Sequence, residues 1–281
     1  MTSPEYQIAH LMNGTVDKTK MYADMDQSKA YAEGRPRYTD DMFKVIVDYC
    51  IETNRKLDLV VDVGCGPGMS TIGFAKYFQK CIGVDVSETQ IACAPKDIPN
   101  CEFKVGYLHQ LPFIKTGSVD LFCSGESFHL MQQKDQTQRT LICRTFAEAD
   151  RVLKPGGTLA IFGYDWLIVE NPEVNSIIYG ILQYYPKEST QIVDKFRTLE
   201  LPYPGWIRND ELKMSVKTNA DKHGDFLNSL WAARAYKNDH PDEDLVENAK
   251  RQITEVLEKQ GNGMEFTVNW NLFILMGHKP M

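Results

Sequence analysis

The feature that most constrains the fold is a glycine-rich turn that follows a short buried segment. Leu59–Val63 is a nearly continuous apolar run, which predicts a fully buried strand of a parallel sheet. The turn, 64–68, reads GCGPG, and a helix is expected over Ser70–Phe78. Gly64 and Gly66 allow a sharp turn and let a ligand lie against bare backbone. Taken alone, the same turn could serve packing only.

Spacing and two acidic residues favour a ligand site over a purely structural turn. The glycines follow the pattern Gly-x-Gly-x-Gly rather than G-x-G-x-x-G, and the turn lacks the Lys-Ser/Thr ending of a P-loop. Asp62 lies two residues before the turn. Asp85 ends the next predicted strand, about 20 residues on, where an acidic side chain can accept hydrogen bonds from a ribose diol. A ligand that carries a ribose is therefore expected.

Strand and helix patterns alternate from residue 39 to residue 164, which predicts right-handed crossovers and a parallel sheet covered on both faces. The predicted strands of this part are 59–63, 81–85, 101–105, 119–123 and 158–162. The predicted helices are 39–51, 70–78, 87–94 and 137–153. After Tyr164 an insertion rich in aromatic residues and prolines interrupts the rhythm. The later segments are predicted as strands over 212–219 and 264–276 and as helices over 225–236 and 243–259.

Composition narrows the class of partner. The chain has 281 residues and a net charge of −7, and its 31 Lys and Arg residues are scattered, so a nucleic-acid partner is not expected. The seven cysteines form no C-x-x-C pair and no zinc-type spacing, so reduced thiols in a cytoplasmic protein and no metal are expected. No apolar run reaches the length of a membrane span, so no membrane partner is expected either.

Five stretches, in this order, resemble the class I methyltransferases that depend on S-adenosylmethionine (SAM), and in particular the methyltransferase type 11-like proteins. They are Val61–Gly68, Gly83–Ser87, Val105–Phe113, Ser118–Phe122 and Leu153–Gly157. The resemblance implies a Rossmann-like α/β fold: a seven-stranded, mostly parallel sheet with helices on both faces and a helical substrate-cover insertion. It implies a single methyltransferase domain over 39–281 with the insertion at about 165–211, preceded by a cofactor-covering segment, 1–38.

The segment Tyr31–Tyr38, which reads YAEGRPRY, is similar to the trans-aconitate methyltransferase subgroup. Gly163-Tyr164 and Asn269–Asn271 also resemble that subgroup. In such proteins the N-terminal segment folds over the cofactor, which implies that Tyr31 and Arg35 bind it. The alternative is that Arg35 only caps a surface helix.

The resemblance implies a role for each matched residue at the cofactor. Gly64 and Gly66 would lie beneath the methionine part, and Asp85 would accept from both ribose hydroxyls. Tyr107 stands where an acidic residue is common in the family, so a backbone carbonyl or His109 would have to bind the adenine amine. The expected cofactor contacts are Tyr31, Arg35, Asp62, Gly64, Gly66, Asp85, Val86, Tyr107, Leu108 and Ser124.

The acceptor site is expected just after the fourth strand, around Glu126–Leu130. His129 could orient a carboxylate, act as a base for an amine or a hydroxyl, or only bind a loop carbonyl. Glu126 would favour a cationic substrate. The expected residues of the substrate pocket are Glu126, His129, Tyr164, Trp166, Trp231 and Arg234.

The sequence thus predicts methyl transfer from SAM to a small molecule by in-line displacement, with a carboxylate oxygen as the leading acceptor. An amine acceptor is the second interpretation, because a neighbouring carboxylate would help an amine to lose its proton. The third, from another class, is a scaffold that binds the cofactor without catalysis and regulates a partner. The oligomeric state stays open.

Overall fold

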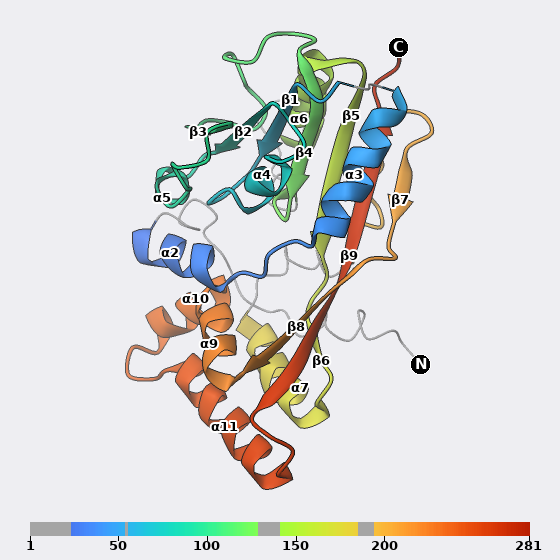
Figure 1. Ribbon diagram of the computed structural model, residues 1–281. Helices are drawn as coiled ribbons and strands as arrows, with labels where there is room; N and C mark the ends of the chain where they lie inside the picture. The colour runs from blue at the N-terminus through green and yellow to red at the C-terminus, as the bar shows by residue number, and fades with distance from the viewer. Residues whose placement is uncertain (1–23, 54–55, 129–140, 185–193) are drawn as a thin grey trace. The chain divides into compact units, whose positions relative to one another are not determined.

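The structure is a computed structural model that describes residues 24–53, 56–128, 141–184 and 194–281. The chain divides into two compact units. The first, here called the glycine-loop unit, comprises 37–163, 198–212 and 272–281. The second, here called the helix-rich unit, comprises 1–36, 164–197 and 213–271. Each unit is described separately below, and the labels are those of Figure 1.

The glycine-loop unit is built on five parallel strands in the order β3-β2-β1-β4-β5. These strands are β1 (Leu59–Val63), β2 (Lys80–Asp85), β3 (Cys101–Val105), β4 (Val119–Gly125) and β5 (Leu153–Tyr164). β9 (Glu265–His278) lies beside β5, and β7 (Ile207–Asn209) pairs with β9 in antiparallel fashion. The predictions of strands at 59–63, 81–85, 101–105 and 119–123 are confirmed. Central strands of this kind are apolar throughout because both faces are buried, and Val60, Val61 and Val63 have no exposed surface.

Four helices accompany these strands: α3 (Asp40–Thr53), α4 (Met69–Phe74), α5 (Glu88–Ala92) and α6 (Leu141–Val152). In Figure 1, α3 and α4 lie in front of the strands. Edge-to-face aromatic contacts hold them there: the ring of Phe74 lies 4.9 Å from that of Phe43 and 6.3 Å from that of Phe162. The prediction of a helix over 70–78 was too long, since α4 ends at Phe74.

The predicted helix over 137–153 and the predicted strand over 158–162 leave 154–157 as a connecting turn, but these residues belong to β5. The register between β4 and β5 shifts between Val119 and Leu121, and Gly156 has a φ of +73°. A glycine in the left-handed region is what an irregular position of a strand needs. The Pro-Gly-Gly sequence therefore marks a bulge within a long strand rather than the start of a new one.

The helix-rich unit holds antiparallel pairs instead. β8 (Lys213–Asn219) and β6 (Ile168–Val169) both pair with the first part of β9. The helices of this unit are α2 (Met25–Gly34), α7 (Pro172–Tyr179), the 3-10 helix η2 (Gly180–Tyr184), α9 (Ala220–Asn228), α10 (Trp231–Asp239) and α11 (Leu245–Gln260). α2 is joined to the end of α9 by a hydrogen bond from Gln27 Nε2 to the carbonyl of Ser229, 3.0 Å long.

Two predictions about this unit and the sheet need correction. The helix predicted over 225–236 is two helices, because the chain leaves α9 at Ser229 and Leu230 and then starts α10. The sheet is mixed and has nine strands rather than seven. The two additional strands, β6 and β7, have only two and three residues, too few for an alternating pattern to be visible in the sequence.

Candidate cofactor and acceptor site

The glycine turn at the end of β1 adopts a conformation that glycine allows and other residues avoid. Gly64, Gly66 and Gly68 have φ values of +70°, +54° and +86°. The turn is fixed to β2, because the N–H groups of Gly64 and Cys65 donate to the carbonyl of Val84 at 2.8 and 3.2 Å. The result is a tight strand-to-helix turn between β1 and α4.

Asp85, the last residue of β2, holds the middle of this turn. Its Oδ2 accepts a hydrogen bond from the N–H of Gly66 at 2.9 Å, and its Oδ1 accepts one from the N–H of Ser87 at 2.9 Å. Burial raises the pKa of the Asp85 carboxyl, and these backbone N–H groups act in the opposite direction. A carboxylate oxygen can accept more than one hydrogen bond, so both oxygens keep capacity for the two hydroxyls of a ribose.

Asp62, near the end of β1, binds the helix that follows the glycine turn. Its side chain is completely buried, and its Oδ2 accepts hydrogen bonds from the hydroxyls of Ser70 and Thr71, both at 2.6 Å. Both hydroxyls belong to the first turn of α4. Burial raises the pKa of Asp62 to about 6. In the structure Asp62 therefore fastens α4 to β1 and reaches no surface from which it could touch a ligand.

Exposed apolar side chains stand at the carboxyl ends of β2 and β3. Val86 is 55% exposed and Tyr107 is 63% exposed. Gly106, between these two strand ends, donates its N–H to the carbonyl of Asp85 at 2.9 Å. The flat ring of an adenine could be sandwiched by such side chains.

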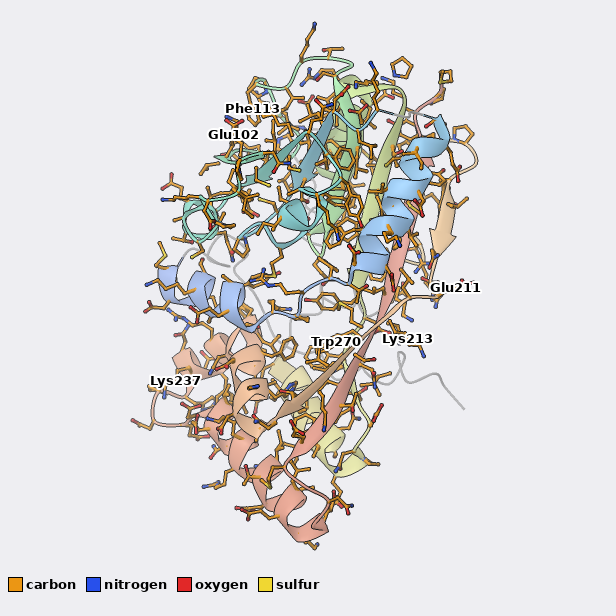
Figure 2. All side chains as sticks on the ribbon, viewed as in Figure 1. Glu102, Phe113, Glu211, Lys213, Lys237 and Trp270 are labelled. Atoms are coloured by element: carbon orange, nitrogen blue, oxygen red, sulfur yellow. The ribbon has the colours of Figure 1, made fainter. Side chains whose placement is uncertain are left out.

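The rest of this edge is a mixture of charge and apolar surface. Lys104 forms an ion pair with Glu102 and lies 5.4 Å above the ring of Phe113. Figure 2 shows Phe113 and Glu102 together beside β3. Tyr107 and His109 have ring centroids 5.8 Å apart. His109 therefore lies near the predicted position of the adenine.

Ser124, predicted to meet the cofactor, is buried at the end of β4 and has a partner that the sequence did not indicate. Its hydroxyl lies 2.5 Å from that of Ser127, and Ser127 donates to the carbonyl of Val63 at 3.3 Å. A Cβ added at Gly64 would overlap the Ser127 side chain, and the next nearest atom, of Leu108, would lie 3.8 Å away. Only the folded sheet brings residues 64 and 127 together.

Glu126 lies between these two serines in an unusual conformation. Its φ is +52°, in the left-handed region that residues with a side chain seldom adopt. Its N–H donates to the carbonyl of Phe162, at the end of β5, at 3.1 Å. The carboxylate lies against the backbone of Gly163, where an added Cβ would overlap Oε1.

The remaining predicted residues lie elsewhere. His129 falls outside the residues that the structure describes. Six others belong to the helix-rich unit, namely Tyr31, Arg35, Tyr164, Trp166, Trp231 and Arg234. Within that unit the Arg35 guanidinium lies 4.7 Å above the ring of Tyr31, and Arg234 forms an ion pair with Asp24. The role of all seven in binding stays a prediction.

The described ranges 24–53, 56–128, 141–184 and 194–281 contain no group of three His, Cys, Asp or Glu side chains arranged to hold a metal ion. They also contain no helix that is long and apolar enough to cross a membrane. All seven cysteines are free thiols.

Comparison with known proteins identifies the glycine-loop unit. Residues 60–157, which include the glycine turn, Asp85 and Glu126, match the family model described as a methyltransferase domain. This part of the unit is a SAM-dependent methyltransferase domain. The left-handed glycine turn, the carboxylate of Asp85 and the exposed side chains of Val86 and Tyr107 fit the methionine, ribose and adenine parts of SAM.

Relatives of the methyltransferase domain agree with this assignment. A Dictyostelium discoideum protein named as a methyltransferase is 26% identical over 261 residues, which cover 90% of this chain and 93% of that protein. Methyltransferase ptaI of Pestalotiopsis fici is 31% identical over 152 residues, and the match covers 50% of this chain and 43% of that protein. The chain thus spans nearly the whole of the first relative and less than half of the second.

The fold is shared with a solved structure. A protein from Anaeromyxobacter dehalogenans, named as a type II methyltransferase, superposes with a TM-score of 0.70 at 23% identity, covering 88% of this chain and 98% of that one. The prediction of a Rossmann-like α/β fold is therefore confirmed. The prediction of a SAM-dependent methyltransferase is confirmed by the family model together with the named relatives.

Proposed function

We propose that the methyltransferase transfers the methyl group of SAM to a small-molecule acceptor by in-line displacement. The observation that carries the proposal is the bond from Gly66 N–H to Asp85, because it joins the turn expected to hold the methionine to the carboxylate expected to hold the ribose. SAM supplies an activated methyl group, so the protein has to bind, orient and exclude water rather than activate the donor.

Several contacts are part of the same proposal. Asp85 accepts from the ribose hydroxyls, Val86 and Tyr107 enclose the adenine with Leu108, and Ser124 meets the amino-acid end. Asp62 contributes through the position of α4. Tyr31 and Arg35 cover the cofactor as in the trans-aconitate subgroup, whose membership we also propose. The segment 1–38 and the insertion at about 165–211 would then enclose cofactor and substrate.

The leading acceptor is a carboxylate oxygen, as the subgroup resemblance suggests, with His129 to orient it. A second candidate, a small-molecule amine, is favoured by one observation: a carboxylate, Glu126, is held at the end of β4 next to the glycine turn. The negative net charge supports small molecules rather than nucleic acid as partners, and the free thiols support a cytoplasmic location.

Calorimetric titration with S-adenosylhomocysteine tests the cofactor site. We expect saturable binding that weakens at least about tenfold in Asp85→Ala, because two backbone N–H groups and the ribose hydroxyls lose their acceptor. Asp97→Ala, at an exposed position after α5, is the matched control and should bind as the wild type does. Absence of saturable binding, or equal binding by both variants, would contradict the proposal.

Transfer of labelled methyl from SAM to panels of small carboxylic acids and small amines tests the acceptor. A product that mild base hydrolyses is an ester and supports the carboxylate; a base-stable product supports the amine. Tight cofactor binding without methylation of either panel would instead favour a non-catalytic scaffold.

A further inference from the structure

The turn that carries Glu126 is an energetically costly piece of backbone at a strand end. A non-glycine residue at a φ of +52° is strained, and such positions persist only where the surroundings fix them. Here the surroundings do so through the bond from Glu126 N–H to the carbonyl of Phe162. The left-handed backbone thus sets the direction of the Glu126 side chain.

Gly163 provides the space for the carboxylate. An added Cβ at that position would overlap Glu126 Oε1 and lie 2.7 Å from the ring of Phe273. A side chain at residue 163 would therefore displace the carboxylate. The position of Glu126 rests on two separate features, a left-handed turn on β4 and a bare backbone on β5.

The turn also lies beside the predicted position of the reactive end of the cofactor. Ser127, the next residue, abuts Gly64 in the glycine turn, and Ser124 precedes the turn at the end of β4. In an open parallel sheet, ligands lie beyond the carboxyl ends of the strands, and residues 64, 85 and 126 stand at the ends of the neighbouring strands β1, β2 and β4. A fixed negative charge at this edge stabilises a positive charge nearby.

We infer that Glu126 is a specificity-determining residue whose carboxylate faces the cationic end of bound SAM and favours a cationic amine as acceptor. The inference rests on the proposed function and favours the second of its two acceptors, the amine, over the carboxylate. In the reaction, Glu126 takes a proton from the ammonium form of the acceptor. The nitrogen lone pair then forms the N–C bond to the methyl group, and the electron pair of the broken C–S bond stays on sulfur.

The test compares two inert ligands that differ in charge at the reactive position. Sinefungin carries an amine where SAM carries its methyl-bearing sulfonium, and S-adenosylhomocysteine is uncharged there. In Glu126→Gln we expect the Kd of sinefungin to rise about tenfold, because the charge pair is lost, while the Kd of S-adenosylhomocysteine changes less than about twofold. Gly163→Ala keeps the charge but displaces it, and should show the same selective loss.

Glu126→Asp keeps the charge on a shorter side chain, so its affinity for sinefungin should fall by an intermediate factor of about three. This conservative variant keeps the test valid if either of the other two variants fails to fold. Glu211→Gln, at an exposed glutamate after β7 that is labelled in Figure 2, is the control and should change neither Kd. Equal changes for both ligands, or no change in Glu126→Gln, would overturn the inference. If neither ligand binds the wild type, the proposed function fails instead.

Discussion

The two ends of the parallel strands hold their buried aspartates in different ways. At the amino ends, Asp120 accepts hydrogen bonds from the N–H groups of Asp58 and Leu59, both at 2.9 Å, and pairs with Lys154 Nζ at 2.7 Å. Near the carboxyl ends, the partners of Asp62 are two hydroxyls and the Cys123 thiol, and those of Asp85 are backbone N–H groups.

The difference indicates that the amino ends of the strands serve stability and the carboxyl ends serve binding. A carboxylate with its own lysine is neutralised within the protein and holds strands together. Carboxylates that are satisfied by neutral donors have no partner cation to balance their charge, and in the described part of the chain no lysine or arginine pairs with Asp62 or Asp85. Such an end of a sheet favours a cationic ligand, and SAM carries a positive charge on sulfur.

The largest effect is expected for Gly64→Ala. The new Cβ would overlap Ser127, and a φ of +70° strains any side chain, so cofactor affinity should fall by about 100-fold. Gly117→Ala is the matched control: its φ is +64°, but no atom lies within 4 Å of the new Cβ. It should cost only about 1 kcal/mol of stability and leave the Kd unchanged.

Calorimetry of S-adenosylhomocysteine binding and chemical denaturation of both glycine variants measure these effects. Equal loss of affinity in the two would mean that backbone strain, not the crowded contact with Ser127, determines the turn.

The next effect is expected at the amino ends of the parallel strands. Lys154→Met should lower the free energy of unfolding by about 3 kcal/mol, because the carboxyl of Asp120, only 1% exposed, would be left buried without its lysine partner. Cofactor affinity should not change, because this pair lies at the other end of the strands. Urea denaturation measures the loss, and Lys115→Met, at an exposed lysine, is the control. Weaker cofactor binding by Lys154→Met would contradict the assignment of stability to the amino ends and binding to the carboxyl ends.

A smaller effect is expected from the titration of Asp62. Its pKa is about 6 in the folded protein against a usual value of 3.8, so between these values the folded state binds more protons than the unfolded state. The contribution of Asp62 to stability should therefore fall as pH rises from about 4 to 6. Asp62→Asn removes this slope, which amounts to at most about 3 kcal/mol.

Urea denaturation at several pH values compares the two proteins, with Asp97→Asn, at an exposed aspartate, as the control. Parallel pH profiles of the wild type and Asp62→Asn would show that burial does not govern this carboxyl.

Much of the glycine-loop unit could be predicted because its signals are local. The apolar runs around Val61 and Leu121 can only be buried strands, and the spacing from Gly64 to Asp85 indicates a ribose site. The two- and three-residue strands β6 and β7 carry no period that a sequence could reveal, and the break between α9 and α10 contains neither glycine nor proline.

The acceptor side was less predictable because it depends on contacts between distant segments. Glu126 could be identified as an ionisable residue after a strand, but its left-handed conformation and the space left by Gly163 depend on the register of β4 against β5. The partnership of Ser127 with Gly64 is of the same kind. Side chains that meet only across the sheet leave no spacing signal along the chain.

Hydrogen exchange with and without saturating S-adenosylhomocysteine tests the central claim most directly. The account predicts slower exchange in peptides that cover 63–68, 84–87 and 105–108, at the carboxyl ends of the strands. It predicts unchanged exchange in peptides that cover 57–59, 118–120 and 153–157, at the amino ends. Protection at the amino ends, or no protection of the glycine turn, would contradict it.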